Sequence, residues 1–522
     1  MVDGRDAPVV ESVEEMAGRF TSELITLTPG WSRKLRDDPD SLQDLERDVH
    51  AAFDRGADLL VAGLLAVVMK QPEFLDDCEQ TRKQFAQPLR RGRQRTIRMR
   101  LLGGLTIWVA SLYCTPRKQA GDQEKHSGLY VELAQFGCGK GVTPGLESRV
   151  ARQAALCPSL EFACRELARE GARLDVKTVR RITYQCGDWL LRLRKHQLQS
   201  WRAGTLPAGS ELHGKRVSVQ LDGGRTRMRS ELRAVAGQAA TTDADGLVVE
   251  DAPGRSKKRA KKTFDASWRE PKLITIFVHD EQGRMAKHSQ VTLEGTFLGP
   301  DAAAELVAMH LHRLGAAGAS SITFAADGAP WIWDRIGQIV AQAKLTQVPI
   351  HEVLDCCHAT HHVSLALKSL GLNEQERLPL YRQHRSLLRN GQWRRVVSEL
   401  RDLSADRELP ELETEIGYLV RHGEAGRMSY RHFRQLGIPL GSGAIESGIR
   451  QVINRRLKSN SLFWRESNAE SMLQVRCQLI SDRWDERLCE MREFRRQHGV
   501  QDWAWTPEPM NVKSEAETSN AD

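Results

Sequence analysis

The middle of the chain alternates strand-like and helix-like segments, and this order constrains the fold more than any other feature of the sequence. Strands are predicted where β-branched and other apolar residues run together, and helices where apolar residues recur every three or four positions. The predicted segments are strands at 217–221, 273–278 and 285–293, a helix at 302–314, a strand at 322–326, a helix at 331–343 and a strand at 348–354. This order, βββαβαβ, predicts an α/β fold in which helices flank a five-stranded sheet.

Acidic residues directly follow three of these strands. Asp222, Asp327 and Asp355 each stand at the carboxyl end of a predicted strand, and ligands bind at that edge of open α/β sheets. Two aspartates brought together there would repel each other unless a divalent cation lay between them. Carboxylate oxygens suit Mg²⁺, and two such ions can promote phosphodiester displacement by a water molecule or a 3′-hydroxyl. A lone aspartate in this position is more often a turn or cap residue, so the prediction depends on the joint arrangement.

A third acidic residue that could complete such a site lies far downstream. Glu446 ends the small-residue stretch GSGAIE, which opens a predicted helix. Arg450 and Asn454 follow it at four-residue spacing, so one helical face carries an acid and then groups suited to nucleic acid. A glutamate in a first helical turn also stabilises the helix dipole, which is the alternative explanation.

The same segment is rich in basic residues. We expect it to hold DNA beside the acidic residues through Arg450, Arg455, Arg456 and Lys458, which suit phosphate groups. Trp464 could stack on an unpaired base. Packing inside the protein is an equally good explanation for Trp464.

Five short stretches together resemble the DDE transposases of bacterial insertion sequences, most closely the ISKra group and its Mutator-like relatives. They are residues 219–223 (VQLDG), 268–272 (WREPK), 326–332 (ADGAPWI), 354–359 (LDCCHA) and 438–446 (IPLGSGAIE). The resemblance implies an RNase H-like catalytic core with a mixed five-stranded sheet, in which Asp222, Asp327 and Glu446 bind Mg²⁺ or, alternatively, Mn²⁺. It also implies that Asp355 and His358 flank the site and orient the scissile or flipped nucleotide.

The resemblance also suggests how the chain is divided. The stretch between Asp327 and Glu446 is too long for a direct connection, so a helical insertion is predicted to interrupt the core. The predicted regions are a helical N-terminal region at 1–85, a β-hairpin with a helix-turn-helix-like DNA-binding region at 86–210, the first part of the core at 211–367, the insertion at 368–434, the last part of the core at 435–490 and a partly disordered tail at 491–522.

Two predicted helices within residues 86–210 form the candidate helix-turn-helix. Ser159 and Asp175 are suited to cap helices at 160–170 and 176–190. The second helix would present Lys177, Arg180 and Arg181 to DNA, where phosphate contacts position the protein and base-edge contacts specify the sequence. The same pattern is common in purely structural helical bundles, so both explanations stay open.

A separate group of residues could bind zinc instead. Cys356, Cys357, His358, His361 and His362 lie close together in the sequence, and two of the histidines have the four-residue spacing of a helical zinc site. Cysteines beside a buried strand are more often core residues.

Together these features predict an enzyme, a DNA transposase that binds the terminal inverted repeats of its element, cleaves the ends and joins the 3′-hydroxyl to target DNA. Its partner would be double-stranded DNA, bound by a homodimer or a larger oligomer. One alternative is an RNase H-like nuclease without strand transfer, and another is a non-catalytic DNA-binding regulator derived from a transposase.

Composition agrees with a nucleic-acid partner rather than a membrane. The net charge of +8 favours a polyanion. The longest apolar run, at 59–69, is shorter than the ~20 residues of a membrane-spanning helix. We therefore expect a cytoplasmic protein, associated with the bacterial nucleoid, that has no membrane partner.

Overall fold

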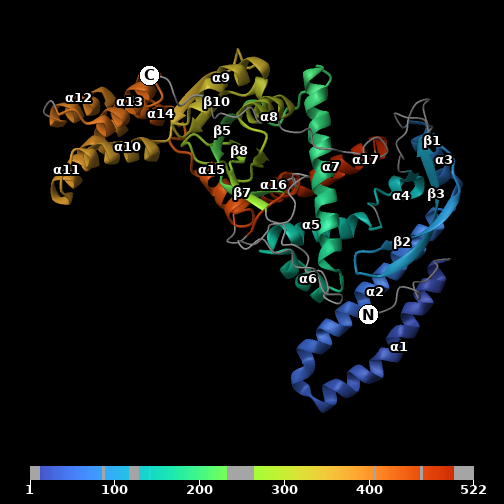
Figure 1. Ribbon diagram of the computed structural model, residues 1–522. Helices are drawn as coiled ribbons and strands as arrows, with labels where there is room; N and C mark the ends of the chain where they lie inside the picture. Colours follow the sequence, from blue (N-terminus) through green and yellow to red (C-terminus); the bar gives the residue numbers. More distant parts are fainter. Residues whose placement is uncertain are drawn as a thin grey trace, which may run out of the picture.

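The computed structural model describes residues 12–84, 89–116, 128–139, 141–231, 264–404, 407–458 and 462–498. Figure 1 shows an N-terminal region in blue and cyan, a central sheet covered by helices, and an arm of helices that extends from the sheet. The long helix α7 (Val176–Arg202) runs between the first two regions. Most of the tail that was predicted to be partly disordered, residues 499–522, lies outside the described residues, and its first residues belong to helix α17 (Trp484–His498).

A mixed five-stranded sheet forms the centre of the molecule and confirms the predicted α/β class. Its strands are β5 (Arg216–Gly223), β8 (Lys272–Val278), β9 (Thr292–Thr296), β10 (Ser321–Ala326) and β11 (Ile350–Leu354). Their order across the sheet is β11-β10-β5-β8-β9. Strands β5, β10 and β11 are parallel, whereas β8 is antiparallel to β5 and β9. The carboxyl ends of β5, β10 and β11 therefore meet at one edge of the sheet.

The structure differs from the sequence prediction on the way into β9. The strand predicted at 285–293 is wrong, because the chain first turns: Asp280 Oδ1 accepts hydrogen bonds from the backbone N–H groups of Gln282 and Arg284. The strand begins only at Thr292. A hairpin that was not predicted, formed by β6 (Thr226–Glu231) and β7 (Phe264–Arg269), stands between β5 and β8.

Helices cover both faces of the sheet because successive strand residues point in opposite directions. Ile274 of β8 packs in one hydrophobic cluster with residues of α8 (Pro300–Arg313) and α9 (Pro330–Gln342). The neighbouring Leu273 packs in another cluster with residues of α7, α16 (Glu466–Ile480) and α17. The sheet is thus the middle layer of three.

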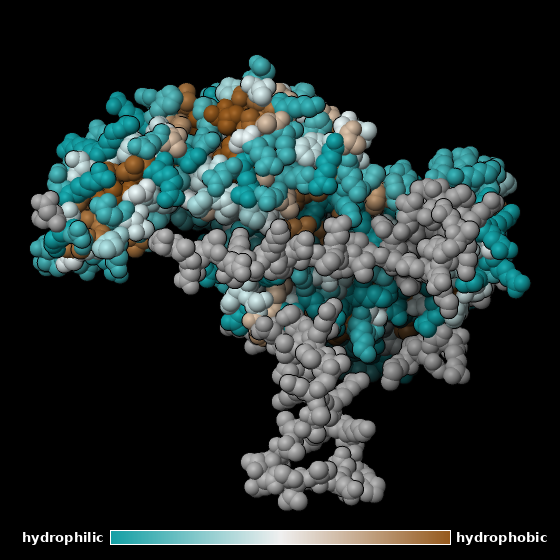
Figure 2. All heavy atoms as spheres, turned by 45° about the horizontal axis from the view of Figure 1, so that its top comes forward, coloured by the Kyte–Doolittle hydropathy of each residue, from teal (hydrophilic) through white to brown (hydrophobic). Residues whose placement is uncertain are grey.

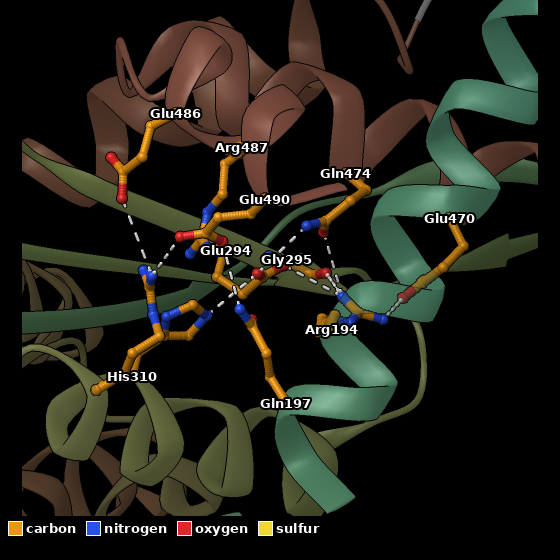
Figure 3. Close-up of polar contacts among 11 residues, drawn as sticks. Arg194, Gln197, Glu294, Gly295, His310, Glu470, Gln474, Glu486, Arg487 and Glu490 are labelled. Carbon is orange, nitrogen blue, oxygen red and sulfur yellow. Dashed lines mark hydrogen bonds and ion pairs between the residues drawn. The ribbon is translucent and has the colours of Figure 1, made fainter. Parts of the chain in front are cut away.

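A buried polar network ties α7 to the outer strand of the sheet (Figure 3). Arg194 of α7 donates hydrogen bonds to Glu294 of β9 at 3.1 Å and to Glu470 of α16 at 2.7 Å. His310 of α8 lies 3.2 Å from the second oxygen of the Glu294 carboxylate. Burial opposes ionisation of Glu294, but the hydrogen bond from His310 and the charge of Arg194 outweigh it and hold the pKa of Glu294 at about 2. The buried carboxylate therefore stays ionised and paired at neutral pH.

We expect Arg194→Met to lower the free energy of unfolding by about 3–5 kcal/mol, because two buried carboxylates would lose their cationic partner. Arg202→Met is the matched control on the same helix. Arg202 pairs with Glu305 but its side chain is 59% exposed, and exposed ion pairs contribute about 0–1 kcal/mol. Urea denaturation of the two variants measures the difference, and equal losses would contradict a stabilising role for the buried network.

The N-terminal region begins with helices and continues into a small sheet. Its elements are α1 (Val13–Asp37), α2 (Leu42–Val68), α3 (Pro72–Gln84), β1 (Leu89–Arg90), β2 (Gln94–Arg100), β3 (Thr106–Pro116), β4 (Leu129–Tyr130) and α4 (Val131–Gln135). Helices α1 and α2 form an extended pair that projects from the body of the molecule (Figure 1). Strands β2 and β3 pair as the predicted hairpin.

The candidate helix-turn-helix is formed by α6 (Leu160–Arg169) and α7, packed against α5 (Pro144–Leu156). Both predicted caps are confirmed: Ser159 Oγ accepts a hydrogen bond from the backbone N–H of Phe162, and Asp175 Oδ1 accepts one from the N–H of Thr178. Helix α7 continues well beyond the predicted end at residue 190, because its second half is buried against the sheet region.

Helices alone form the described part of the arm. The arm includes the stretch of the predicted insertion, 368–434, but begins earlier, because its first helix starts at Cys356. The helices are α10 (Cys356–Ser369), α11 (Glu374–Arg389), α12 (Trp393–Ser404), α13 (Pro410–Glu424) and α14 (Tyr430–Gln435). Figure 2 shows a mostly hydrophilic face on which some hydrophobic side chains gather over this arm, at the left. Across the described ranges, no helix is long and apolar enough to cross a membrane.

Candidate active site

Asp222 and Asp327 lie side by side at the edge of the sheet where the parallel strands end. Gln220 of β5 pairs with Ala325 of β10, and the same register two residues later brings the aspartates together. Asp222 Oδ1 accepts a hydrogen bond from the N–H of Gly223 at 2.6 Å, and Asp327 Oδ1 accepts one from the N–H of Ala329 at 3.1 Å. Both side chains are half-buried, so each carboxylate is held by backbone but still reaches solvent.

The two carboxylates influence each other electrostatically. Burial raises the pKa of Asp222 to about 6, and the charge of Asp327 adds to this effect. His358 acts in the opposite direction because its positive form would stabilise the carboxylate. A divalent cation between Asp222 and Asp327 would offset both the burial and the repulsion.

Glu446 lies on α15 (Gly443–Gly448), a short helix that packs against β5 and β8. The buried Gln220 of β5 fixes this helix at both sides of its start: its side-chain oxygen accepts a hydrogen bond from the N–H of Ile445 at 3.0 Å, and its nitrogen donates to the carbonyl of Gly441 at 3.1 Å. The Glu446 side chain is 50% exposed, and its Oε1 lies 3.9 Å from Nε2 of His358. Glu446 is thus near His358, and His358 in turn acts electrostatically on Asp222, so Glu446 lies at the rim of the same site.

Asp355 directly follows β11, as predicted, but its side chain does not have the predicted role. Its side chain is buried, and Oδ1 accepts hydrogen bonds from the N–H groups of Cys357 and His358 at 2.6 and 2.9 Å. Oδ2 accepts from the N–H and the hydroxyl of Ser442 at 2.5 and 2.8 Å. Direct orientation of a nucleotide by Asp355 is inconsistent with this burial. Instead, Asp355 joins the start of α10 to the loop that precedes Glu446.

His358, by contrast, is accessible. It lies in the first turn of α10, its side chain is 42% exposed, and it acts on both Asp222 and Glu446. A substrate that reaches the aspartates would therefore also meet this imidazole.

A fourth acidic residue at the site was missed by the sequence analysis. Glu270 stands between β7 and β8, and a Cβ atom added at Gly223 would collide with its carboxylate. Its charge contributes to the raised pKa of Asp222. Lys272 Nζ lies 2.5 Å from Glu270 and 4.3 Å from the centre of the Trp331 ring. The motif WREPK could have indicated this position. It leads directly into β8, which is antiparallel to β5 and so begins at the edge of the sheet where β5 ends.

Most of the predicted DNA-contacting residues are exposed. Lys177, Arg180 and Arg181 lie on the first turns of α7, and Arg181 donates a hydrogen bond to Gln185. Arg450, Arg455 and Lys458 are exposed on the segment that follows Glu446, which continues as a π-helix, η3 (Ile449–Asn454).

Arg456 and Trp464 are corrections to the predicted DNA surface, because both are buried. Arg456 Nε donates a hydrogen bond to the carbonyl of Ala154 at the end of α5. Trp464 Nε1 donates to the carbonyl of Leu457 at 3.0 Å, and the Arg456 guanidinium lies 5.2 Å from the centre of the Trp464 ring. These side chains hold the polypeptide after Glu446 in place and have no surface to offer a base or a phosphate.

Metal binding depends on the donors that the site presents. Among the described residues, no three histidine, cysteine, aspartate or glutamate side chains are already arranged as a ligand set. Asp222 and Asp327 nevertheless supply adjacent hard oxygen donors, which suit Mg²⁺ or Mn²⁺. At the alternative zinc site, His362 is engaged with Glu415 at 2.5 Å and stacks on Tyr418.

Comparison of the chain with protein-family models, with curated proteins and with solved structures finds no match.

Proposed function

We propose that the chain is a DDE-type DNA transposase with an RNase H-like catalytic core. The observation that carries the proposal is the pair Asp222 and Asp327, side by side at the carboxyl ends of adjacent parallel strands. The sheet order β11-β10-β5-β8-β9, with β8 antiparallel, supports an RNase H-like core. Glu446, fastened to β5 through Gln220, supplies the third carboxylate.

In this proposal Asp222, Asp327 and Glu446 would hold Mg²⁺ or Mn²⁺. When bound, the metal would polarise a phosphodiester and lower the pKa of an attacking water molecule or 3′-hydroxyl. Gln220 and Asp355 keep the Glu446 helix against the sheet, as their hydrogen bonds indicate. His358 is placed to orient the substrate or move a proton at the rim of the site.

The exposed basic residues would bind the DNA. Arg450, Arg455 and Lys458 follow Glu446 directly and are suited to hold a cleaved end beside the carboxylates. Lys177, Arg180 and Arg181 would contact the terminal repeats, with the protein acting as a homodimer or larger oligomer on nucleoid DNA in the cytoplasm.

A nuclease without strand transfer and a non-catalytic regulator remain the alternatives, and one experiment separates all three. Purified protein is incubated with the DNA segments that flank its gene and with a circular target plasmid, in Mg²⁺, Mn²⁺ or EDTA. We expect metal-dependent cleavage and joining of the 3′-hydroxyl end to the plasmid.

Cleavage without joining of either native or pre-cut ends would favour the nuclease. Sequence-specific binding without any metal-dependent cleavage would favour the regulator and overturn the proposed enzyme. Lys458→Gln with Arg455→Gln should reduce joining more than cleavage, because these residues would retain the end after it is cut.

A further inference from the structure

A basic groove lies between two elements that are far apart in the sequence. Strands β2 and β3 form one side and the first turns of α7 form the other. The groove has a volume of about 320 Å³ and is lined by Arg98, Met99, Arg100, Thr106, Gly141, Val142, Thr178 and Arg181. Three arginines therefore line one hollow, beside the exposed start of the second helix of the helix-turn-helix.

Arg100 is fixed at this groove by its neighbours. Its Nε donates a hydrogen bond to the hydroxyl of Thr106 at 3.3 Å, and its Nη1 donates to the carbonyl of Arg173 at 3.4 Å. Arg98 lies two residues earlier on the same face of β2, and Arg98 is exposed. The hairpin thus presents two arginines of fixed spacing to the start of α7.

Three positive charges meet at the groove. Burial lowers the pKa of Arg100, and the positive charges of Arg98 and Arg181 lower it further. Asp175 attracts Arg100, but its carboxylate already caps α7 by accepting hydrogen bonds from Thr178. Repulsion among the three arginines would fall when an anion enters the groove.

We propose that this groove binds a phosphate group of the DNA backbone and so positions α7 on the duplex. The proposal rests on the proposed function, because DNA is taken as the ligand. An arginine fork matches the geometry of a phosphate group. A contact from β2 and one from α7 to the same strand would fix the orientation of the helix, as phosphate contacts do in DNA complexes. Neither the hairpin nor α7 alone offers this arrangement.

The test measures binding of a fluorescent DNA duplex of arbitrary sequence to the full chain in EDTA, over a range of salt concentrations. For the variant Arg98→Gln with Arg100→Gln, we expect affinity to fall about tenfold or more. We also expect the slope of log affinity against log salt to decrease by about one unit, because the loss of one phosphate contact removes about 0.9 from that slope.

The control variant, Arg394→Gln with Arg395→Gln, loses the same charge on α12, at the opposite end of the molecule in Figure 1. It should keep a nearly normal slope. Arg100→Lys keeps the charge but loses the fork, so it should retain most of the slope with weaker binding. Thermal unfolding of each variant checks that it is folded.

The outcomes separate this proposal from the proposed function. If the groove variant and the α12 control variant have equal effects, and the protein still binds and cleaves DNA, the proposal for the groove is overturned but the proposed function is not. Stabilisation of the wild type by inorganic phosphate over chloride at equal ionic strength, with unchanged DNA binding by the groove variant, would assign the groove to a free anion and overturn it too. Failure of the wild type to bind any duplex would overturn both proposals.

Discussion

Asp222→Asn and Asp327→Asn should each reduce metal-dependent DNA cleavage by about 10³-fold or more while leaving DNA binding almost unchanged. Several kcal/mol of charge stabilisation in the transition state correspond to a factor of this size. Asparagine keeps the shape of aspartate and can still accept the hydrogen bond from the backbone N–H of Gly223 or Ala329. The substitution therefore removes the charge without removing the local structure.

Asp222→Asn should also change the stability of the folded protein. Burial raises the pKa of Asp222 to about 6 from its ordinary value of 3.8, with a smaller contribution from Asp327. The stability contributed by the protonated carboxyl is thus complete below about pH 3.8 and is lost as the pH rises through about 6. At pH 7.5 the ionised carboxylate weakens the metal-free fold, so Asp222→Asn should melt at the same temperature or higher.

With a divalent metal, the wild type should instead melt at a higher temperature than Asp222→Asn. Mg²⁺ or Mn²⁺ should raise the melting temperature of the wild type, because a ligand that binds only the folded state stabilises it. The melting temperature of Asp222→Asn should respond much less. The matched control is Asp301→Asn, which removes an 83% exposed carboxylate on α8. Near-normal cleavage by either asparagine variant of the pair would exclude that residue from the site.

The aspartate pair could be predicted from the sequence because it depends on local order. A buried strand followed directly by an aspartate, twice, places two carboxylates at one edge if the two strands are parallel neighbours. The alternation of strands and helices predicts parallel neighbouring strands, and β5 and β10 are paired in parallel. Caps at Ser159 and Asp175 were predictable for the same reason, since each depends on residues only three positions apart.

Arg456 illustrates what the sequence could not reveal. Arg456 was predicted to bind DNA because it is one of several basic residues after Glu446, and a run of basic residues does not show which of them is buried. The segment is also not a regular α-helix, since the N–H of Arg455 bonds to the carbonyl of Arg450, five residues back. The buried guanidinium of Arg456 donates a hydrogen bond to a carbonyl of α5, which is distant in the sequence. The spacing of residues within the segment after Glu446 cannot predict a partner in another part of the chain.

Asp355→Asn should reduce DNA cleavage by about 10²-fold, even though this residue is too deeply buried to touch DNA. The carboxylate accepts two hydrogen bonds from the start of α10 and two from Ser442, and Glu446 follows Ser442 after one helical turn. An asparagine oxygen can still cap α10. Its amide nitrogen would then face the backbone N–H of Ser442, donor against donor, and the loop would move. Displacement of a catalytic group by about 1 Å can cost about 10²-fold in rate.

Stability should fall as well, by about 1–3 kcal/mol, because a buried donor is left without an acceptor. Ser442→Ala is the graded control. It removes the hydroxyl hydrogen bond to Asp355 but keeps the bond from the backbone N–H, so both losses should be smaller. Cleavage rates and urea denaturation of Asp355→Asn and Ser442→Ala, measured with the wild type, give the two effects separately.

Arg194→Met then distinguishes positioning of Glu446 from general destabilisation. Its expected loss of stability is at least as large as that of Asp355→Asn, but Arg194 contacts Glu294 and Glu470 rather than the loop before Glu446. At a temperature where both variants remain folded, Arg194→Met should cleave DNA at close to the wild-type rate and Asp355→Asn should not. If the cleavage rates of the two variants instead fall in proportion to their stabilities, Asp355 has no special connection to Glu446, and its four hydrogen bonds serve only to hold the fold together.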